Sequence, residues 1–193
     1  MLERVIADLS AILAQGRKLL IGVPVHFDTL AANSMRLDYL KLAEAIPPPA
    51  RRLVIFELVE IPSGVPQGRM REVVAVLKRN ARAVIADVGL QAAEVAAFRD
   101  VGVLSIGGEV TSRTGPESTI IEQMQRFVVA TEKANLSAFV HGLRSISLTS
   151  SAVAAGFRYI DGDMVRSVVD APQEVIRYNP ADLYRRLLQG RSA

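Results

Sequence analysis

The sequence predicts an α/β protein built on a parallel sheet, in which strands and helices alternate six times along the chain. Three observations predict this fold class. Short apolar and β-branched runs alternate with segments that carry apolar residues at helical spacing. The runs lack polar alternation, which is typical of strands covered on both faces by crossover helices. The length of 193 residues, 50% of them hydrophobic, suits one domain around one core.

The first third of the chain shows each type of element. Apolar residues recur at helical spacing through Leu2–Leu13, and Gly16 is placed to end that helix. Leu19–Phe27 is short, apolar and partly β-branched, which predicts a buried strand. Its Pro24 cannot donate a ladder hydrogen bond, so the strand either bulges there or lacks one neighbour. Asn33–Ile46 is predicted as a helix that the following three prolines stop.

The remaining elements follow from the same two patterns. Five further apolar runs are predicted strands: Leu53–Glu60, Ala83–Asp87, Val101–Ile106, Ser137–His141 and Phe157–Asp161. Five further segments are predicted helices: Met70–Leu77, Gln91–Arg99, Glu117–Ala134, Leu148–Ala155 before Gly156, and one that starts at Asn179-Pro180 and buries Leu183, Leu187 and Leu188.

Six such units fit either an open doubly wound sheet or most of a (β/α) barrel. A dinucleotide-binding doubly wound fold needs a glycine-rich turn between a strand and a helix. Gly107-Gly108 lacks the third glycine and the helix start of that motif. The barrel is therefore the favoured architecture.

Composition excludes several classes of protein. The absence of Cys excludes a disulfide scaffold, a thiolate zinc site and a Cys nucleophile. The net charge is only +3, aromatic residues are 5% of the chain and Trp is absent, so nucleic acid is not an expected partner. Glu3 and Asp8 interrupt the first apolar pattern, and no apolar run is long enough to span a bilayer. We expect a cytoplasmic protein with no membrane partner.

Chemistry in parallel α/β folds is located at the carboxyl ends of the strands. Four side chains there are the candidates for ligand binding at the barrel mouth: His26, Glu57, Asp87 and His141. Imidazoles and carboxylates together could hold a metal ion or share a proton. The alternative is structural. A lone strand-end histidine is more often hydrogen-bonded for stability, and Asp87 could simply cap the next turn. Glu60 is interpreted as a solvated strand end.

Five segments resemble, in order and spacing, the motifs of EAL domains, the cyclic di-GMP phosphodiesterase family. They are RLVIFELVEIPSG, AVIADVGLQAAEVAAFRDVGVLSI, LSAFVHGLRSIS, GFRYIDGDMV and YNPADLYRRLL. Upstream, LLIGVPVHFDTL falls where the family has an asparagine-containing strand. The resemblance implies a (β/α) barrel whose carboxyl-end face binds two divalent metals and a cyclic dinucleotide in bacterial signalling.

The resemblance also implies that most of the family's site is lost. Its glutamate of the "LEITE" strand falls on Glu57 and is kept, and the second of its paired aspartates falls on Asp87. The other positions carry different residues: Pro24 for the metal-binding asparagine, Ala86 for the first aspartate, Ser105 for the lysine, Gly107 for the aspartate after it, His141 and Arg144 for two glutamates, and Asp161 for a glutamine. The strand that gives the family its name is absent. A two-metal site needs several carboxylates, so the resemblance implies an inactive centre with no cofactor.

We therefore expect one EAL-like domain over residues 1–193, comprising the later six of eight strands. Residues 1–18 form its leading helix, and residues 164–193 its C-terminal helix and tail. An incomplete barrel leaves strand edges open along Leu19–Phe27 and Phe157–Asp161. Three outcomes are open: the missing strands lie upstream in a longer protein, a second copy covers the gap, or another protein pairs with an edge. Four functions stay open: an inactive interaction module, a non-catalytic cyclic di-GMP receptor, a metal-dependent hydrolase that uses the four strand-end candidates, and, ranked last, nucleic-acid binding through the arginine clusters. The receptor ranks below protein binding because several ligand contacts are missing as well.

Overall fold

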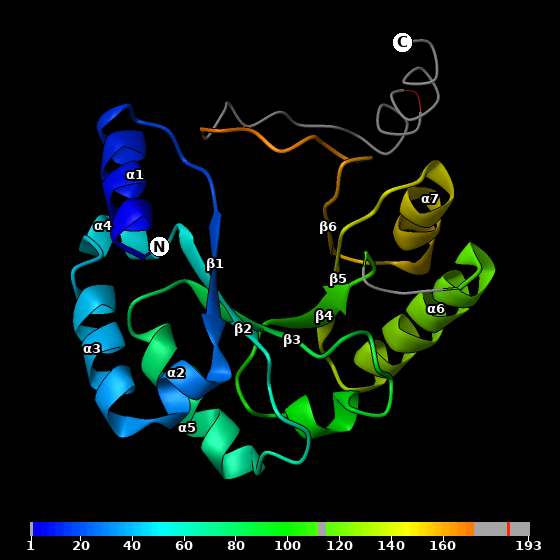
Figure 1. The fold of residues 1–193 in the computed structure, drawn as a ribbon, viewed down its shortest axis with the longest axis horizontal. Helices are drawn as coiled ribbons and strands as arrows, with labels where there is room; N and C mark the ends of the chain where they lie inside the picture. The colour runs from blue at the N-terminus through cyan, green and yellow to red at the C-terminus, as the bar shows by residue number, and fades with distance from the viewer. Residues whose placement is uncertain (1, 112–114, 172–184, 186–193) are drawn as a thin grey trace. The chain divides into compact units, whose positions relative to one another are not determined.

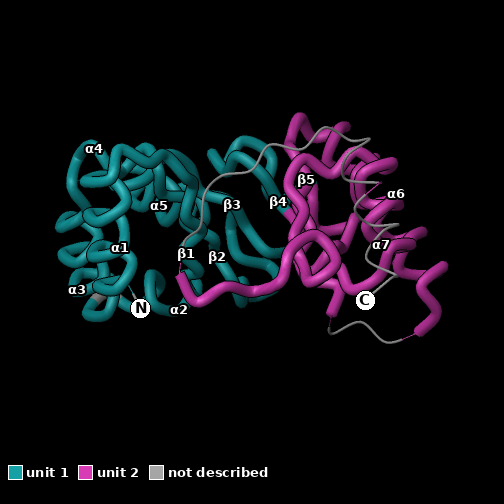
Figure 2. Tube along the Cα trace, turned by 90° about the horizontal axis from the view of Figure 1, so that it is seen from above, with its two compact units in different colours: residues 1–88, 96–106 teal, residues 89–95, 107–193 magenta. Residues whose placement is uncertain are grey.

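The computed structural model describes residues 2–111, 115–171 and 185. Six strands follow one another in the sheet in the order β1-β2-β3-β4-β5-β6. Every neighbour is thus also a neighbour in sequence, as in a (β/α) barrel, whereas the order of a doubly wound sheet reverses at a switch point. The chain divides into two compact units, residues 1–88 with 96–106 and residues 89–95 with 107–193 (Figure 2).

The first unit contains three complete strands and five helices. The strands are β1 (Ile21–His26), β2 (Val54–Val59) and β3 (Ala83–Asp87), and the helices are α1 (Leu2–Ala14), α2 (Phe27–Ala31), α3 (Asn33–Glu44), α4 (Pro48–Arg51) and α5 (Gln67–Lys78). β1 pairs with β2 and β2 with β3, both in parallel. The predicted strands are confirmed to within two residues at each end. The short helices α2 and α4 were not predicted. Pro48 stands at the first position of α4, so the prolines that stop one helix begin the next.

Alternating burial in β2 separates its two faces. Val54, Phe56 and Leu58 are fully buried, while Ile55, Glu57 and Val59 between them are half-buried. The helices of this unit lie on one side of β1 and β2 (Figure 1). This is the side to which the buried residues Val54, Phe56 and Leu58 belong. Glu57 therefore belongs to the face that no helix of this unit covers. A carboxylate within an apolar strand is tolerated there because it keeps access to solvent.

Pro24 interrupts neither β1 nor its pairing. The register runs without a bulge from Ile21 opposite Val54 to His26 opposite Val59. The Ile21 N–H donates to the Leu53 carbonyl at 2.8 Å, so alternate N–H groups at Val23 and Val25 point the same way. The backbone nitrogen of Pro24 then points away from β2, toward the unpaired side of the edge strand. The N–H that proline lacks is therefore not needed for a hydrogen bond between β1 and β2. Of the two alternatives left by the sequence, the missing neighbour is correct.

The second unit contains the end of β4 (Ser105–Glu109), β5 (Ser137–His141), β6 (Tyr159–Ile160), α6 (Glu117–Lys133) and α7 (Ile146–Ala155). The Val110 N–H donates to the His141 carbonyl at 3.0 Å, and β5 pairs in parallel with β6. α6 buries Ile120, Met124, Phe127 and Val128, the helical spacing predicted from the sequence. α7 begins at Ser145, whose side chain accepts from the Leu148 N–H, and ends at the left-handed Gly156.

Two predicted elements between β3 and α6 are wrong. The helix expected over Gln91–Arg99 is only the 3₁₀ turn Val95–Phe98. The strand expected over Val101–Ile106 is displaced to Ser105–Glu109, because Gly102 within it has a positive φ angle of 93°, which a regular strand does not adopt. The helix predicted from Asn179 lies outside the described residues except for Arg185, which is helical. None of the helices in the described part of the chain has the length and apolar character that a bilayer crossing requires.

Gly107-Gly108, which the sequence left without a role, allows two close approaches inside the second unit. A Cβ on Gly107 would collide with the carbonyl oxygen and ring of Phe139, 2.5 Å from its Cγ. A Cβ on Gly108 would lie 2.7 Å from the Cα of Gly89. Both distances are shorter than any real Cβ contact. The two glycines therefore serve packing, and no phosphate-binding turn is formed here.

Candidate functional site

Three of the four candidates share one face of the first unit's sheet. Pro24, Glu57 and Ile85 lie opposite one another in register across β1, β2 and β3. His26 and Asp87 each lie two residues further along their strands, so they point to the same side as Glu57. The sheet thus brings His26, Glu57 and Asp87 to the carboxyl ends of neighbouring strands, as the sequence predicts. His141 belongs to the second unit.

His26 pairs with Glu60 rather than with Glu57. Its Nδ1 lies 3.0 Å from Oε2 of Glu60, the residue that directly follows β2. Both side chains are exposed, with 58% and 75% of their surface accessible. A hydrogen-bonded pair this exposed contributes little to stability. Glu60 was interpreted as a solvated strand end; it is solvated, and it also supplies the hydrogen-bond partner of His26.

His141 forms a second and more enclosed pair, with Asp161. Its Nδ1 lies 2.5 Å from Oδ2 of Asp161, which directly follows β6. The other carboxylate oxygen accepts from the Gly142 N–H at 3.2 Å. Since an ionised carboxylate only accepts, Nδ1 of His141 carries the proton in this pair. The ring of His141 also packs against Phe139, with 4.8 Å between ring centres.

The loops after β4 and β5 support this pair. The Thr111 hydroxyl donates to the Gly142 carbonyl at 3.4 Å, and the Arg144 guanidinium donates to the Thr111 carbonyl at 3.0 Å. Gly142 has a φ of 77°, and a Cβ there would collide with the Thr111 hydroxyl. Asp161 also uses its backbone carbonyl to accept from the Leu143 N–H at 3.0 Å. The histidine and its carboxylate are thus held by a continuous hydrogen-bonded loop cluster.

The surroundings of Asp161 lower its pKa. Partial burial raises the pKa of this carboxyl, but the hydrogen bond from His141, the charge of that ring and the Gly142 N–H outweigh it, so the pKa lies below its ordinary value. Stability from a lowered carboxyl pKa is present above the unfolded-state pKa of about 3.9 and is lost as the pH falls through the folded-state value. The pair therefore stabilises the folded chain at neutral pH and ceases to do so in acid.

We expect Asp161→Asn to lower the free energy of unfolding by at most about 1 kcal/mol at pH 7, because the carboxylate is largely exposed. The difference from the wild type should shrink as the pH falls below about 4. Thermal unfolding followed by circular dichroism from neutral to acidic pH measures it. Asp163→Asn is the control, since it removes the same charge two residues away at an exposed position. A constant difference across this range would contradict the assigned pair.

The described residues do not fit a two-metal centre. Among them, no group of three or more His, Asp or Glu side chains could hold a metal ion. The reason is visible around Glu57, whose neighbours in register are Pro24 and Ile85, neither of which offers a ligand atom. Two acidic positions of the resemblance carry Ala86 and Gly107, which offer no ligand atom either, so Asp87 is the one other carboxylate kept beside Glu57.

Glu60 and Asp161 are strand-end acids that the sequence also shows, but they are not among the four candidates. A signal was present in each case. Each acid directly follows a strand, and each bonds to the histidine that ends the preceding neighbour in the sheet, His26 on β1 and His141 on β5. In a parallel sheet with sequential order, the ends of consecutive strands are adjacent. An acid after one strand and a histidine at the end of the strand before it should therefore be considered together.

Solved structures of EAL-domain proteins are similar to this chain. The FimX EAL domain of Xanthomonas citri, solved in complex with c-diGMP, matches over 91% of this chain and 69% of its own, with a TM-score of 0.61 and 15% identity. The YkuI protein of Bacillus subtilis, solved with c-di-GMP and calcium, matches over 89% of this chain and 42% of its own, with a TM-score of 0.59 and 15% identity.

An EAL domain protein from Listeria monocytogenes matches over 81% of this chain, with a TM-score of 0.59 and 12% identity, and this chain spans 63% of its length. No protein-family model matches the sequence, and no curated protein matches it. At these identities the likeness shows the fold alone. The predicted fold class, an incomplete (β/α) barrel of EAL type, is thereby confirmed.

Proposed function

We propose that this chain with an EAL fold is a non-catalytic domain of bacterial signalling, which acts by binding another protein or a second copy of itself. The observation that carries the proposal is the row Pro24–Glu57–Ile85. Glu57 is kept at the carboxyl end of the barrel strands, but the residues beside it in register carry no ligand atoms. Glu57 and Asp87, the two acids that are kept, are too few to neutralise two divalent ions and position the water between them.

Packing in the second unit supports the same proposal. Gly107 occupies the position where the resemblance places an acidic residue, and the ring of Phe139 fills the space that its side chain would need. Phe139 itself is 1% exposed. The acidic side chain is thus absent, and a buried aromatic ring takes its space. The core is packed around glycine at this position.

The His141–Asp161 pair argues in the same direction. Both residues stand at positions where the resemblance places different side chains, and they bond to each other and to the backbone of Gly142. An imidazole whose Nδ1 donates to a carboxylate is oriented as in many structural and catalytic pairs. Here the carboxylate already accepts from two donors, which supports a role in holding the loops after β5 and β6.

The strand edges support an interaction role. β1 pairs with β2 and β6 with β5, and each stands at an end of the strand order. Edge strands present backbone groups to which a partner strand can bind. β1 is the longer edge, with six residues, against two in β6. Leu20 before β1 and Tyr159 on β6 are large apolar side chains that stay exposed, at 47% and 39%.

The decisive experiment measures hydrolysis of cyclic di-GMP with Mg²⁺ or Mn²⁺ by the purified chain and by Glu57→Gln. We expect the two proteins to be indistinguishable, because the described residues bring no three metal-ligand side chains together around Glu57. An active EAL phosphodiesterase is the positive control for the assay. Turnover by the wild type that is lost in Glu57→Gln would contradict the proposal.

Calorimetric titration with cyclic di-GMP separates the interaction module from the receptor. The named neighbours bind this dinucleotide, which is why the receptor is the second candidate. We expect no heat at dinucleotide concentrations of about tens of micromolar. Light scattering over a range of protein concentrations then distinguishes self-association from binding of another protein. We do not propose the metal-dependent hydrolase, because His26 pairs with Glu60 and the described residues bring no three metal ligands together.

A further inference from the structure

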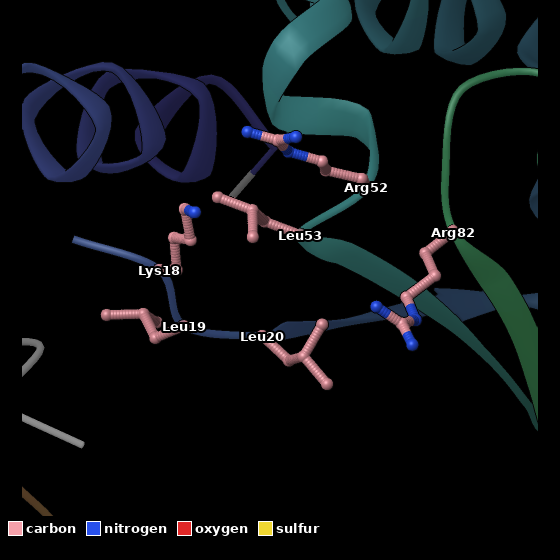
Figure 3. Close-up of a pocket in the computed structure, with 6 residues that line it drawn as sticks. All are labelled: Lys18, Leu19, Leu20, Arg52, Leu53 and Arg82. Carbon is pink, nitrogen blue, oxygen red and sulfur yellow. The ribbon is translucent and has the colours of Figure 1, made fainter. Parts of the chain in front are cut away.

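A pocket in the first unit lies at the end of the strands opposite the candidate site. It has a volume of about 290 Å³ and is lined by Lys18, Leu19, Leu20, Arg52, Leu53 and Arg82 (Figure 3). These residues directly precede β1, β2 and β3. Three of the six are cations, three are leucines, and none of the lining residues is acidic.

The sheet register brings the segments that carry the three cations to one edge. Ile21 lies opposite Val54, and Ile55 lies opposite Ala83, so the residues before three neighbouring strands meet at one edge. Arg82 is anchored there by its backbone, since its N–H donates to the Val54 carbonyl at 2.9 Å. Adjacent strands are about 4.8 Å apart, which places the basic side chains around one small surface.

Several other arginines of this unit have partners that explain them. Arg51 donates to the Ile46 and Glu44 carbonyls at the end of α3, and Arg69 binds Glu72 and the Ala31 carbonyl. Lys18, Arg52 and Arg82 differ: in the described part of the chain, no hydrogen bond or ion pair joins their charged groups to another residue. Three like charges without acid partners around one concavity create a positive potential there.

Apolar surface lies between the charges. Leu53 is buried at 6% exposure, while Leu20 keeps 47% of its surface accessible. Figure 3 shows the guanidinium of Arg82 turned toward Leu20, and Lys18 and Arg52 around Leu53. No aromatic ring lines the pocket, so it lacks the stacking platform of a nucleic-acid site. A volume near 300 Å³ stands at the lower limit of small-molecule sites.

We propose that this pocket binds a small organic phosphate, with at least two negative charges for the cations and a short apolar group for the leucines. Arginine forks suit phosphate oxygens because they can donate two parallel hydrogen bonds. The site is independent of the function proposed above, since it uses none of the residues at the carboxyl ends of the strands.

Calorimetric titration of the full chain with phenyl phosphate tests this proposal, at about 20 mM and about 300 mM salt. We expect saturable binding that is weaker at the higher salt concentration. Inorganic phosphate should bind less tightly than phenyl phosphate, because it lacks the group that covers Leu20. Amide chemical shifts in a ¹⁵N spectrum should change mainly at residues 18–20, 52–53 and 82.

Three variants locate the site. Arg82→Ala should weaken phenyl phosphate binding about tenfold or more. Leu20→Ser should weaken phenyl phosphate but leave inorganic phosphate unchanged. Arg79→Ala is the matched control, because it removes the same charge from an exposed position outside the pocket, and it should bind as the wild type does. Absence of saturable binding, an equal loss in Arg79→Ala, or shift changes confined to other residues would overturn the proposal.

Discussion

Gly107→Asp is expected to prevent the chain from folding, although it restores the acidic residue of the EAL pattern. The new Cβ alone would collide with the carbonyl oxygen and ring of Phe139. The carboxylate would then be forced into a site where Gly107 and Phe139 are both buried. Overpacking and an unpaired buried charge together cost at least about 5 kcal/mol, which is comparable with the whole stability of a domain.

The matched control for this variant is Gly22→Asp. Gly22 also lies in a strand, but a Cβ there has no atom within 4 Å, so the same substitution meets open space. Soluble yield, circular dichroism and thermal unfolding compare the two. We expect a wild-type-like spectrum only for Gly22→Asp. A folded Gly107→Asp chain with an unchanged melting temperature would show that Phe139 does not occupy this position.

Gly162→Ala is expected to cause the second largest loss of stability. Gly162 has a φ of 137°, which L-residues rarely adopt, and a Cβ there would lie 2.8 Å from the Cα of Leu143 and closer still to its N and O. Its carbonyl accepts from the N–H groups of Val165 and Arg166. The collision therefore involves backbone on both sides and cannot be relieved by a rotamer change. We expect a loss of about 3 kcal/mol.

Gly64→Ala separates the two causes of that loss. Gly64 also has a positive φ, 79°, but nothing lies within 4 Å of a Cβ there, so this variant carries the conformational cost alone, about 1 kcal/mol. For a chain of this size, the additional loss in Gly162→Ala should lower the melting temperature by several degrees more, at about 2–4 °C for each kcal/mol. Equal melting temperatures for the two variants would contradict the close approach to Leu143.

The strands were predictable because short apolar, β-branched runs are typical of strands that are buried on both faces. Ala83–Asp87 and Ser137–His141 coincide with β3 and β5. The segment between Gln91 and Ile106 was not predictable, because tight turns there decide the path. Leu90 and Asp100 have positive φ angles of 57° and 62°. A positive φ angle at a residue other than glycine cannot be recognised from the spacing of apolar residues.

The candidate site was predictable in position but not in pairing. Strand ends could be read from the sequence, and they placed His26, Glu57 and Asp87 on one face of the first unit's sheet. The partners of the histidines depend on the direction of side chains after the last paired residue. Glu60 adopts a φ of 53° directly beyond β2, which sets its position relative to His26 in a way that no spacing rule describes.

The proline of β1 has a consequence for how this chain avoids uncontrolled assembly. A strand that pairs with the open edge of β1 would lack one backbone hydrogen bond near the middle of this six-residue strand, because Pro24 has no N–H to donate. Stacking of many identical chains into a fibre depends on an unbroken ladder, so the gap disfavours it. A specific binder loses only this one bond and can recover it through side-chain contacts, so the same residue that deters indiscriminate pairing leaves selective pairing open.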